Sequence, residues 1–200
     1  MEKLNENRLF WKRLLFSQTL VDKDRNRKIA YVAMMTALNV VANMFFEFKF
    51  AETQFSFTIV VSAITGIIIG PLFGFVACFL GDLVGFLYHS VGLGYLPWVG
   101  VAMGMVALIS GFVVNGLPLK IKGAIYFKLA IVSILTFAIC TVGINTTAFW
   151  LLYSKVPYGT YLISRLFLQG QIWNSVVNYA LLFVLVPIVA RIPFLRIKIR

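Results

Sequence analysis

The most constraining feature of this chain is a long stretch with almost no charge. The stretch runs from Ile29 to Leu119, and its only formal charges are Glu47, Lys49, Glu52 and Asp82. Soluble domains carry charged faces on most helices, whereas blocks of about 20 apolar residues match the ~30 Å hydrocarbon layer of a bilayer. Charged residues make up 12% of the whole chain, against about 25% in soluble domains. The sequence therefore predicts an integral membrane protein.

We expect an all-α fold with six transmembrane helices. The predicted spans are residues 29–46, 57–69, 72–88, 96–114, 125–152 and 162–189. The second is short and meets a turn at Gly70-Pro71, and the last two are long enough to tilt or to pass the membrane surface. One membrane domain, 29–190, then lies between a basic tail, 1–28, and a second basic tail, 191–200.

The basic residues predict the orientation. Of 18 Lys and Arg residues, only Lys49, Lys155 and Arg165 fall on the side opposite the tails. Cytoplasmic loops carry the excess of Lys and Arg, so both termini are expected in the cytoplasm. The net charge of +11 thus reflects membrane topology and not nucleic-acid binding. The apolar and basic residues of segment 8–16 predict an interfacial helix, which is either an anchor on anionic lipid or a docking helix for a partner.

The sequence lacks the residues that most membrane enzymes need. It has no G-x-x-x-x-G-K-[ST] phosphate loop, a single histidine, His89, and three acidic residues after Asp24. This inventory argues against an enzyme, a metal site or a bound cofactor. Cys78 and Cys140 lie inside spans, so no disulfide is expected. For Asp82, deep in a span, a structural contact, a ligand contact and proton coupling all remain open.

Aromatic and amide side chains gather in the outer halves of the spans, where they predict a binding pocket. The candidate residues are Phe55, Trp98, Asn145, Trp150, Arg165, Gln169, Trp173 and Asn174. Arg165, Gln169 and Trp173 are expected on one face of the last helix, at i, i+4 and i+8. A cation, an amide and an aromatic plate suit a planar, polar ligand such as a pterin.

Small residues recur at four-residue spacing and predict close helix packing. The series are Gly66, Gly70 and Gly74, then Ala77, Gly81 and Gly85, then Gly100 and Gly104. A similar strip in the first span, made of Ala30, Ala33 and Ala37, is expected to face outward toward a partner subunit.

Several short motifs carry a family resemblance. They are Ile69-Gly70-Pro71-Leu72-Phe73-Gly74, Leu80-Gly81-Asp82-Leu83-Val84-Gly85-Phe86-Leu87, Asn145-Thr146 with Trp150, and Arg165 with Gln169. With these motifs and its six-span pattern, the chain resembles the substrate-binding S component of an energy-coupling factor (ECF) vitamin transporter, closest to the folate branch. It departs from that branch at Leu96-Pro97-Trp98-Val99-Gly100 and at Gln54-Phe55-Ser56-Phe57.

The resemblance implies a transport subunit of the bacterial cell membrane. Such a subunit captures a vitamin, here folate or a related pterin, while a membrane coupling subunit and two separate ATPase subunits drive release inward. It further implies that the Ala30, Ala33 and Ala37 strip meets the coupling subunit and that the first outward loop gates the pocket. Cobalamin, a queuine-like base, a small secondary carrier or channel, and a membrane-embedded enzyme remain as alternatives.

Overall fold

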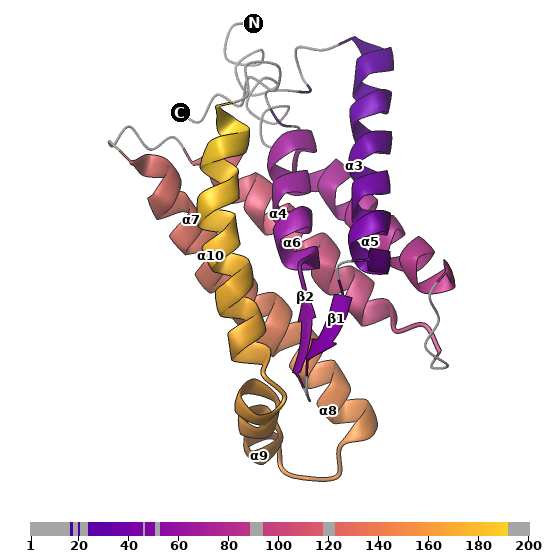
Figure 1. Ribbon diagram of the computed structural model, residues 1–200, viewed down its shortest axis with the longest axis vertical. Helices are drawn as coiled ribbons and strands as arrows, with labels where there is room; N and C mark the ends of the chain where they lie inside the picture. The colour runs from indigo at the N-terminus through magenta and orange to yellow at the C-terminus, as the bar shows by residue number, and fades with distance from the viewer. Residues whose placement is uncertain are drawn as a thin grey trace, which may run out of the picture.

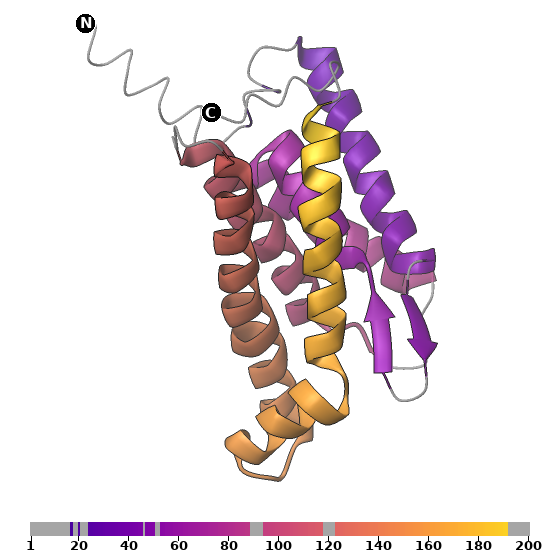
Figure 2. The ribbon, with the colours of Figure 1, turned by 60° about the vertical axis from the view of Figure 1, so that its left-hand side comes forward.

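A computed structural model describes residues 17, 20, 24–45, 47–50, 53–88, 94–117 and 123–191. The interfacial helix predicted at 8–16 and most of both basic tails lie outside these residues. The described part is an elongated bundle of helices with a small hairpin near one end (Figure 1). The first long helix begins, and the last one ends, at the end of the bundle opposite that hairpin (Figures 1 and 2).

Within the described residues, five helices are long and apolar enough to cross a membrane. They are α3 (Arg25–Phe45), α5 (Pro71–Tyr88), α6 (Pro97–Gly116), a composite helix, and α10 (Gln171–Ala190). The composite helix joins α7 (Ala124–Thr136), the π-helical segment η1 (Phe137–Thr146) and α8 (Thr147–Tyr153) into 30 continuous residues. The prediction of a helical membrane protein is therefore confirmed.

Helix α4 (Thr58–Ile69) is the short central element of the bundle. Its 12 residues span about 18 Å at 1.5 Å per residue, less than a full bilayer crossing. Nearly all of its side chains are buried among α3, α5, α6 and α10. The helix ends where Gly70 adopts a φ of 95°, and Pro71 then begins α5, as the Gly-Pro pair predicts.

The glycine series pack helices together inside the bundle, as predicted. A Cβ atom on Gly66 would lie 1.9 Å from the carbonyl oxygen of Ala107 in α6, so the two backbones touch. In α5, a Cβ atom on Gly81 would lie 2.6 Å from the Cβ of Asn39, so α5 packs closely against α3. These approaches leave no room for a methyl group.

A buried amide joins α3 to α4. Asn39 donates from Nδ2 to the Met35 carbonyl at 2.8 Å and to Thr65 Oγ1 at 2.7 Å, and its Oδ1 accepts from Ser62 Oγ at 3.2 Å. Since lipid offers no partners, these bonds satisfy a polar side chain that would otherwise destabilise the span.

The connection between α3 and α4 contains an antiparallel hairpin, which was not expected from the sequence. Strand β1 (Glu47–Phe50) pairs with β2 (Thr53–Ser56), so that Glu47 lies opposite Ser56 and Phe48 opposite Phe55. The alternation of Phe with charged residues in β1 is a period-two strand signal. Figure 2 shows the hairpin beside the N-terminal half of α10.

The last predicted span, 162–189, is not one helix. Helix α9 (Tyr158–Ile163) continues into the π-helical segment η2 (Ser164–Leu168), and the chain then turns at Gly170, which has a φ of 69°. Helix α10 begins only at Gln171. A left-handed glycine ends helical hydrogen bonding, so the expected single helical face through Arg165, Gln169 and Trp173 does not exist.

Candidate ligand-binding site

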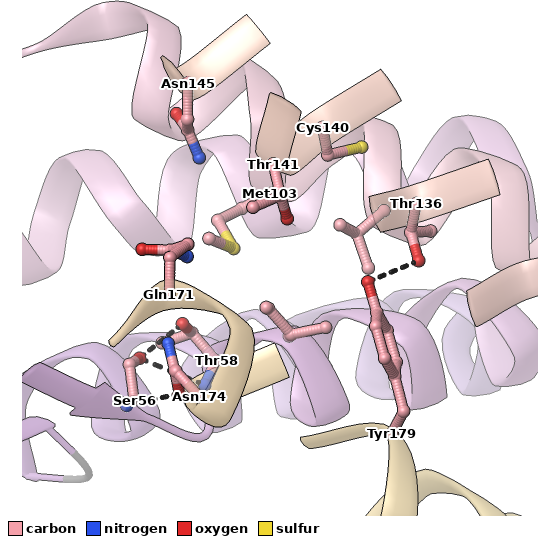
Figure 3. A pocket seen from close by; sticks show the side chains of 12 residues that line it. Ser56, Thr58, Met103, Thr136, Cys140, Thr141, Asn145, Gln171, Asn174 and Tyr179 are labelled. Atoms are coloured by element: carbon pink, nitrogen blue, oxygen red, sulfur yellow. Dashed lines mark hydrogen bonds between the residues drawn. The ribbon is translucent and has the colours of Figure 1, made fainter. Parts of the chain in front are cut away.

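A polar cavity of about 120 Å³ lies in the bundle between the end of β2, α4, α6, η1 and α10 (Figure 3). It occupies the half of the bundle near the hairpin, away from the N-terminal end of α3 and the C-terminal end of α10. The lining residues are Ser56, Thr58, Ile59, Met103, Val106, Thr136, Cys140, Thr141, Asn145, Gln171, Asn174 and Tyr179.

The lining is polar but carries no formal charge. Hydroxyl groups come from serine, threonine and tyrosine, and carboxamides come from Asn145, Gln171 and Asn174. In Figure 3 Asn145 and Gln171 approach the cavity from different helices, while Thr58 and Asn174 lie at its hairpin end. Each carboxamide both donates and accepts hydrogen bonds, so the site suits an uncharged ligand edge with alternating donors and acceptors.

The π-helical segment η1 supplies one wall of the cavity. Two of its threonine hydroxyls bond to carbonyls five residues back: Thr146 Oγ1 donates to the Thr141 carbonyl at 2.8 Å, and Thr147 Oγ1, just after the segment, donates to the Val142 carbonyl at 3.3 Å. The wider turn lets Thr141 and Asn145 line the cavity together with Thr136 of α7. Single π turns inside α-helices are frequent at functional sites.

Tyr179 lines the end of the cavity away from the hairpin. Thr136 Oγ1 donates to the Tyr179 hydroxyl at 3.1 Å, which links α7 to α10 below the carboxamides. Figure 3 shows this bond at one edge of the cavity and the Ser56, Thr58 and Asn174 group at another.

Two asparagines of α10 bind the end of the hairpin. Asn174 Oδ1 accepts from the Ser56 backbone N–H at 3.2 Å, and Asn178 Nδ2 donates to the Ser56 carbonyl at 2.7 Å. Asn178 Nδ2 also contacts Asn174 O at 2.8 Å and Asn174 Oδ1 at 2.9 Å. Ser56 Oγ in turn lies 2.6 Å from Thr58 Oγ1. The hairpin is thereby fastened to the cavity wall.

A second polar cluster surrounds Phe149, one helical turn beyond Asn145. The guanidinium carbon of Arg165 lies 4.2 Å from the Phe149 ring centre, and the Trp98 ring meets the same phenyl edge-on at 5.9 Å. Arg165 also donates to the Tyr161 hydroxyl at 3.2 Å. Among the described residues, Trp98 Nε1, Asn145 Oδ1 and Arg165 Nε are buried without a hydrogen-bond partner.

The structure brings some of the predicted site residues together and separates others. Asn145 and Asn174 line the cavity, and Trp98 and Arg165 meet at Phe149. Whether these four bind a ligand stays a prediction.

The other four predicted residues lie away from the cavity or are described only by their backbone. Gln169 is exposed and Trp173 is 64% exposed, so neither lines the cavity, because the turn at Gly170 rotates α10 relative to η2. Trp150 donates to the Val156 carbonyl at 2.8 Å and packs on Tyr158. Phe55 lies in β2 opposite Phe48.

Several lining residues were missed from the sequence. Thr58, Thr136 and Thr141 are single hydroxyl residues within apolar runs. Gln171 and Tyr179 lie in α10, which was expected to continue the helical face of Arg165 and Gln169 but starts anew after Gly170. Polar residues that recur through otherwise apolar helices would have pointed to them, since lipid cannot satisfy a hydroxyl. Their convergence depends on η1 and on the turn at Gly170, which periodicity alone does not reveal.

Asp82 lies outside the cavity, in a contact between α5 and the segment before α6. Tyr95 donates its hydroxyl to Asp82 Oδ2 at 3.2 Å, and Asp82 is 8% exposed. A Cβ atom on Gly100 would lie 2.6 Å from the Tyr95 hydroxyl and 3.0 Å from Asp82 Oδ2, so Gly100 makes room for this pair. These contacts favour the structural interpretation of Asp82.

The predicted partner strip is on the surface of the chain. Ala30, Ala33 and Ala37 are all exposed on α3, whereas Tyr31 and Met35 of the same helix are buried. The strip therefore lies on a face of α3 that the bundle does not cover. No cluster of three or more His, Cys, Asp or Glu residues that could hold a metal occurs in the described part of the chain.

Comparison with known proteins gives a family and a fold. The model of the family described as ECF-type riboflavin transporter, S component, matches residues 23–193. Among solved structures, the chain is similar to the crystal structure of FolT bound with folic acid, with a TM-score of 0.63 and 19% sequence identity. That similarity covers 78% of this chain and 90% of the other. A search of curated proteins found no match. Because the family match spans most of its length, the chain belongs to the family of ECF-type riboflavin transporter S components.

Proposed function

We propose that this chain is the vitamin-binding subunit of an ATP-driven importer. The observation that carries the proposal is the uncharged, amide- and hydroxyl-lined cavity within an apolar helical bundle of the S component family. Such a cavity binds a small polar molecule in a place where lipid cannot compete for hydrogen bonds. The chain has no phosphate loop, so the energy comes from two ATPase subunits that act through a membrane coupling subunit.

The ligand class is a flat, fused-ring heterocycle. Folate or a related pterin is supported by the sequence motifs and by the likeness to FolT, which was solved with folic acid. Riboflavin is a second candidate, because the matching family is described by that vitamin and because the cavity lining carries no cation for a folate carboxylate. Both rings present amide-like edges that the carboxamides of Asn145, Gln171 and Asn174 complement.

The membrane arrangement that fits this function has six crossings and both termini in the cytoplasm. The sixth crossing is α4, which is short but continuous with the buried core. The basic residues at the ends of α3 and α10 then face the cytoplasm, and the hairpin and cavity face outward to capture the vitamin. The subunit resides in the bacterial cell membrane, and its exposed Ala30, Ala33 and Ala37 strip contacts the coupling subunit.

The size of the cavity implies that capture involves motion. At about 120 Å³ it is smaller than the roughly 300–1,000 Å³ of ordinary ligand sites. A vitamin with two or three fused rings requires the cavity walls to move apart. The hairpin forms part of the wall and contacts the helices mainly at α10 and α3. The hairpin therefore moves outward when the ligand enters.

The decisive experiment is identification of the bound molecule. The chain is purified in detergent from cells grown in rich medium, and the retained small molecules are identified by mass spectrometry. Binding of folic acid and riboflavin to the stripped protein is then measured, with cobalamin and queuine as comparison ligands. Retention of a vitamin with submicromolar affinity supports the proposal. Absence of vitamin binding, together with ion-coupled flux by the chain alone in vesicles, would favour a secondary carrier instead.

A further inference from the structure

The backbone of Ser56 joins the hairpin to α10 through two hydrogen bonds. Ser56 ends β2, and α4 begins two residues later at Thr58. Both hydrogen-bonding groups of the Ser56 peptide are used by α10: the N–H by Asn174 and the carbonyl by Asn178. The two asparagines lie one helical turn apart and act together as a strand edge would.

The two asparagines differ in their access to the cavity. Asn174 lines it, as does Ser56, whereas Asn178 does not and is 0% exposed. Asn178 therefore holds the hairpin without reaching the ligand position. Its NH₂ group has two hydrogens for three acceptors, and among the described residues its Oδ1 is buried without a partner.

This unsatisfied oxygen bears on how firmly the hairpin is held. A buried carbonyl oxygen without a donor destabilises the closed arrangement, and water reaching it on opening would remove that penalty. Asn178 thus holds Ser56 by a hydrogen bond while its own unpaired Oδ1 destabilises the closed arrangement. Such a contact closes the hairpin in the resting state without locking it.

We propose that Asn178 is a positioning residue that latches the hairpin over the cavity and thereby sets the rates of ligand entry and exit. The proposal deepens the proposed function, since it assigns regulation of access to the same site. Asn174 belongs both to the latch and to the cavity wall, so it couples occupancy of the cavity to closure of the hairpin. Asn178 acts only on the latch.

The test compares Asn178→Leu with the matched control Asn115→Leu. Like Asn178, Asn115 donates from Nδ2 to a backbone carbonyl of another element. Its acceptor is the Ile67 carbonyl at 3.1 Å, at the end of α4 far from the cavity. Hydrogen–deuterium exchange of the ligand-free chain is followed for peptides covering 47–56. Dissociation and association rates are measured with riboflavin and with folic acid, whichever the wild-type chain retains.

We expect faster exchange in the hairpin peptides and a dissociation rate raised at least tenfold in Asn178→Leu, with neither change in Asn115→Leu. The association rate should stay the same or rise, which a merely misfolded variant would not show, because misfolding lowers the bound fraction without speeding release. Unchanged hairpin exchange, or faster exchange with an unchanged dissociation rate, would overturn the latch. If Asn178→Leu does not fold, Asn178→Ser, whose hydroxyl is too short to span the same gap, gives the same comparison.

The two proposals fail separately. If neither vitamin binds to the wild-type chain, the proposed function fails on that measurement. Exchange of the ligand-free hairpin still decides whether Asn178 holds Ser56, and unchanged exchange rejects the latch whatever the ligand is.

Discussion

Tyr95 donates its hydroxyl to Asp82 at 3.2 Å, and this pair packs against Gly100 at the start of α6. The bond gives the single carboxylate of α5 a partner in the segment just before α6. An ionised group without such a partner costs at least ~2.5–3.5 kcal/mol in a span. The pair therefore stabilises the fold outside the cavity.

The first prediction concerns this pair. Tyr95→Phe should lower the free energy of unfolding by about 1.5 kcal/mol, the scale of a hydrogen bond to a charged group. Asp82→Asn should also lower stability, while vitamin binding stays within tenfold of wild type. Thermal unfolding in detergent and equilibrium binding measure the two effects. A thousandfold loss of affinity in a well-folded Asp82→Asn chain would make Asp82 a ligand contact.

The pH dependence of the Tyr95 contribution has a definite sign. Burial, and then the neighbouring Asp82 carboxylate, raise the pKa of Tyr95 to about 12 from its ordinary value near 10. A raised pKa means that the protonated phenol is favoured in the fold, so its stabilisation is complete below pH 10 and lost as pH rises through 12. The stability difference between wild type and Tyr95→Phe should be constant from pH 6 to about 9.

The second prediction tests helix packing at Gly66. A Cβ atom there would lie 1.9 Å from the Ala107 carbonyl oxygen, and backbone atoms cannot move aside cheaply. Gly66→Ala should therefore cost at least ~3 kcal/mol, at the upper end of overpacking effects, and reduce the yield of folded protein. Gly159→Ala is the control, because nothing lies within 4 Å of its added methyl group. Equal stability of the two variants would refute the close approach of α4 and α6.

The third prediction separates the cavity from the surface of α10. Asn145→Leu or Thr141→Val should weaken vitamin binding at least tenfold, about 1.4 kcal/mol, because each removes a polar group that lines the cavity. Trp173→Ala and Gln169→Ala should keep wild-type affinity, since both side chains are exposed. Titration of each purified variant with folic acid and riboflavin checks this. The opposite ranking would move the ligand to the η2–α10 junction.

The fourth prediction addresses the coupling surface. Ala33→Leu or Ala37→Leu should leave vitamin binding unchanged but abolish uptake by the whole transporter, because a larger side chain prevents close approach of a partner helix. Binding to the purified chain and uptake by intact cells are measured side by side. Normal uptake by both variants would remove the strip from the interface.

The fifth prediction is the orientation in the membrane. A cysteine at position 53, in β2, should react with an impermeant thiol reagent on intact cells, while one at position 121 should react only after the cells are opened. Cys78 and Cys140 are buried and should contribute little background. The reversed pattern would place the cavity on the cytoplasmic side.

The sequence predicted most of the helices because long apolar runs have few alternatives in a bilayer. The turn at Gly70 was also predictable, because a Gly-Pro pair ends one helix and begins the next. The break at Gly170 was not predicted, since apolar residues continue on both sides of Gln169-Gly170-Gln171 and an isolated glycine is common in membrane helices. Because of the left-handed φ of Gly170, Trp173 lies on the surface and Gln171 lines the cavity, contrary to the expected continuous helix.

The cavity could be predicted only partly from the sequence, and its use as a ligand site stays a prediction. Asn145 and Asn174 were among the candidates, and both line the cavity. Thr136 and Thr141 share a wall only because η1 widens the helix by one residue per turn, and a π turn leaves no clear pattern in the sequence. The Ser56 contacts with α10 join residues more than a hundred positions apart, which periodicity cannot predict.

The shortness of α4 has a consequence for ion leakage. With a cavity at one end of this 12-residue helix, the insulating layer along its axis is only about 18 Å thick, little more than half of the surrounding bilayer. Ile67, Ile68 and Ile69 close its other end, each at most 4% exposed, and Ser17 donates to the Ile68 carbonyl there. In the proposed six-crossing arrangement, the membrane potential would fall over this shorter path, with these three buried side chains at its end.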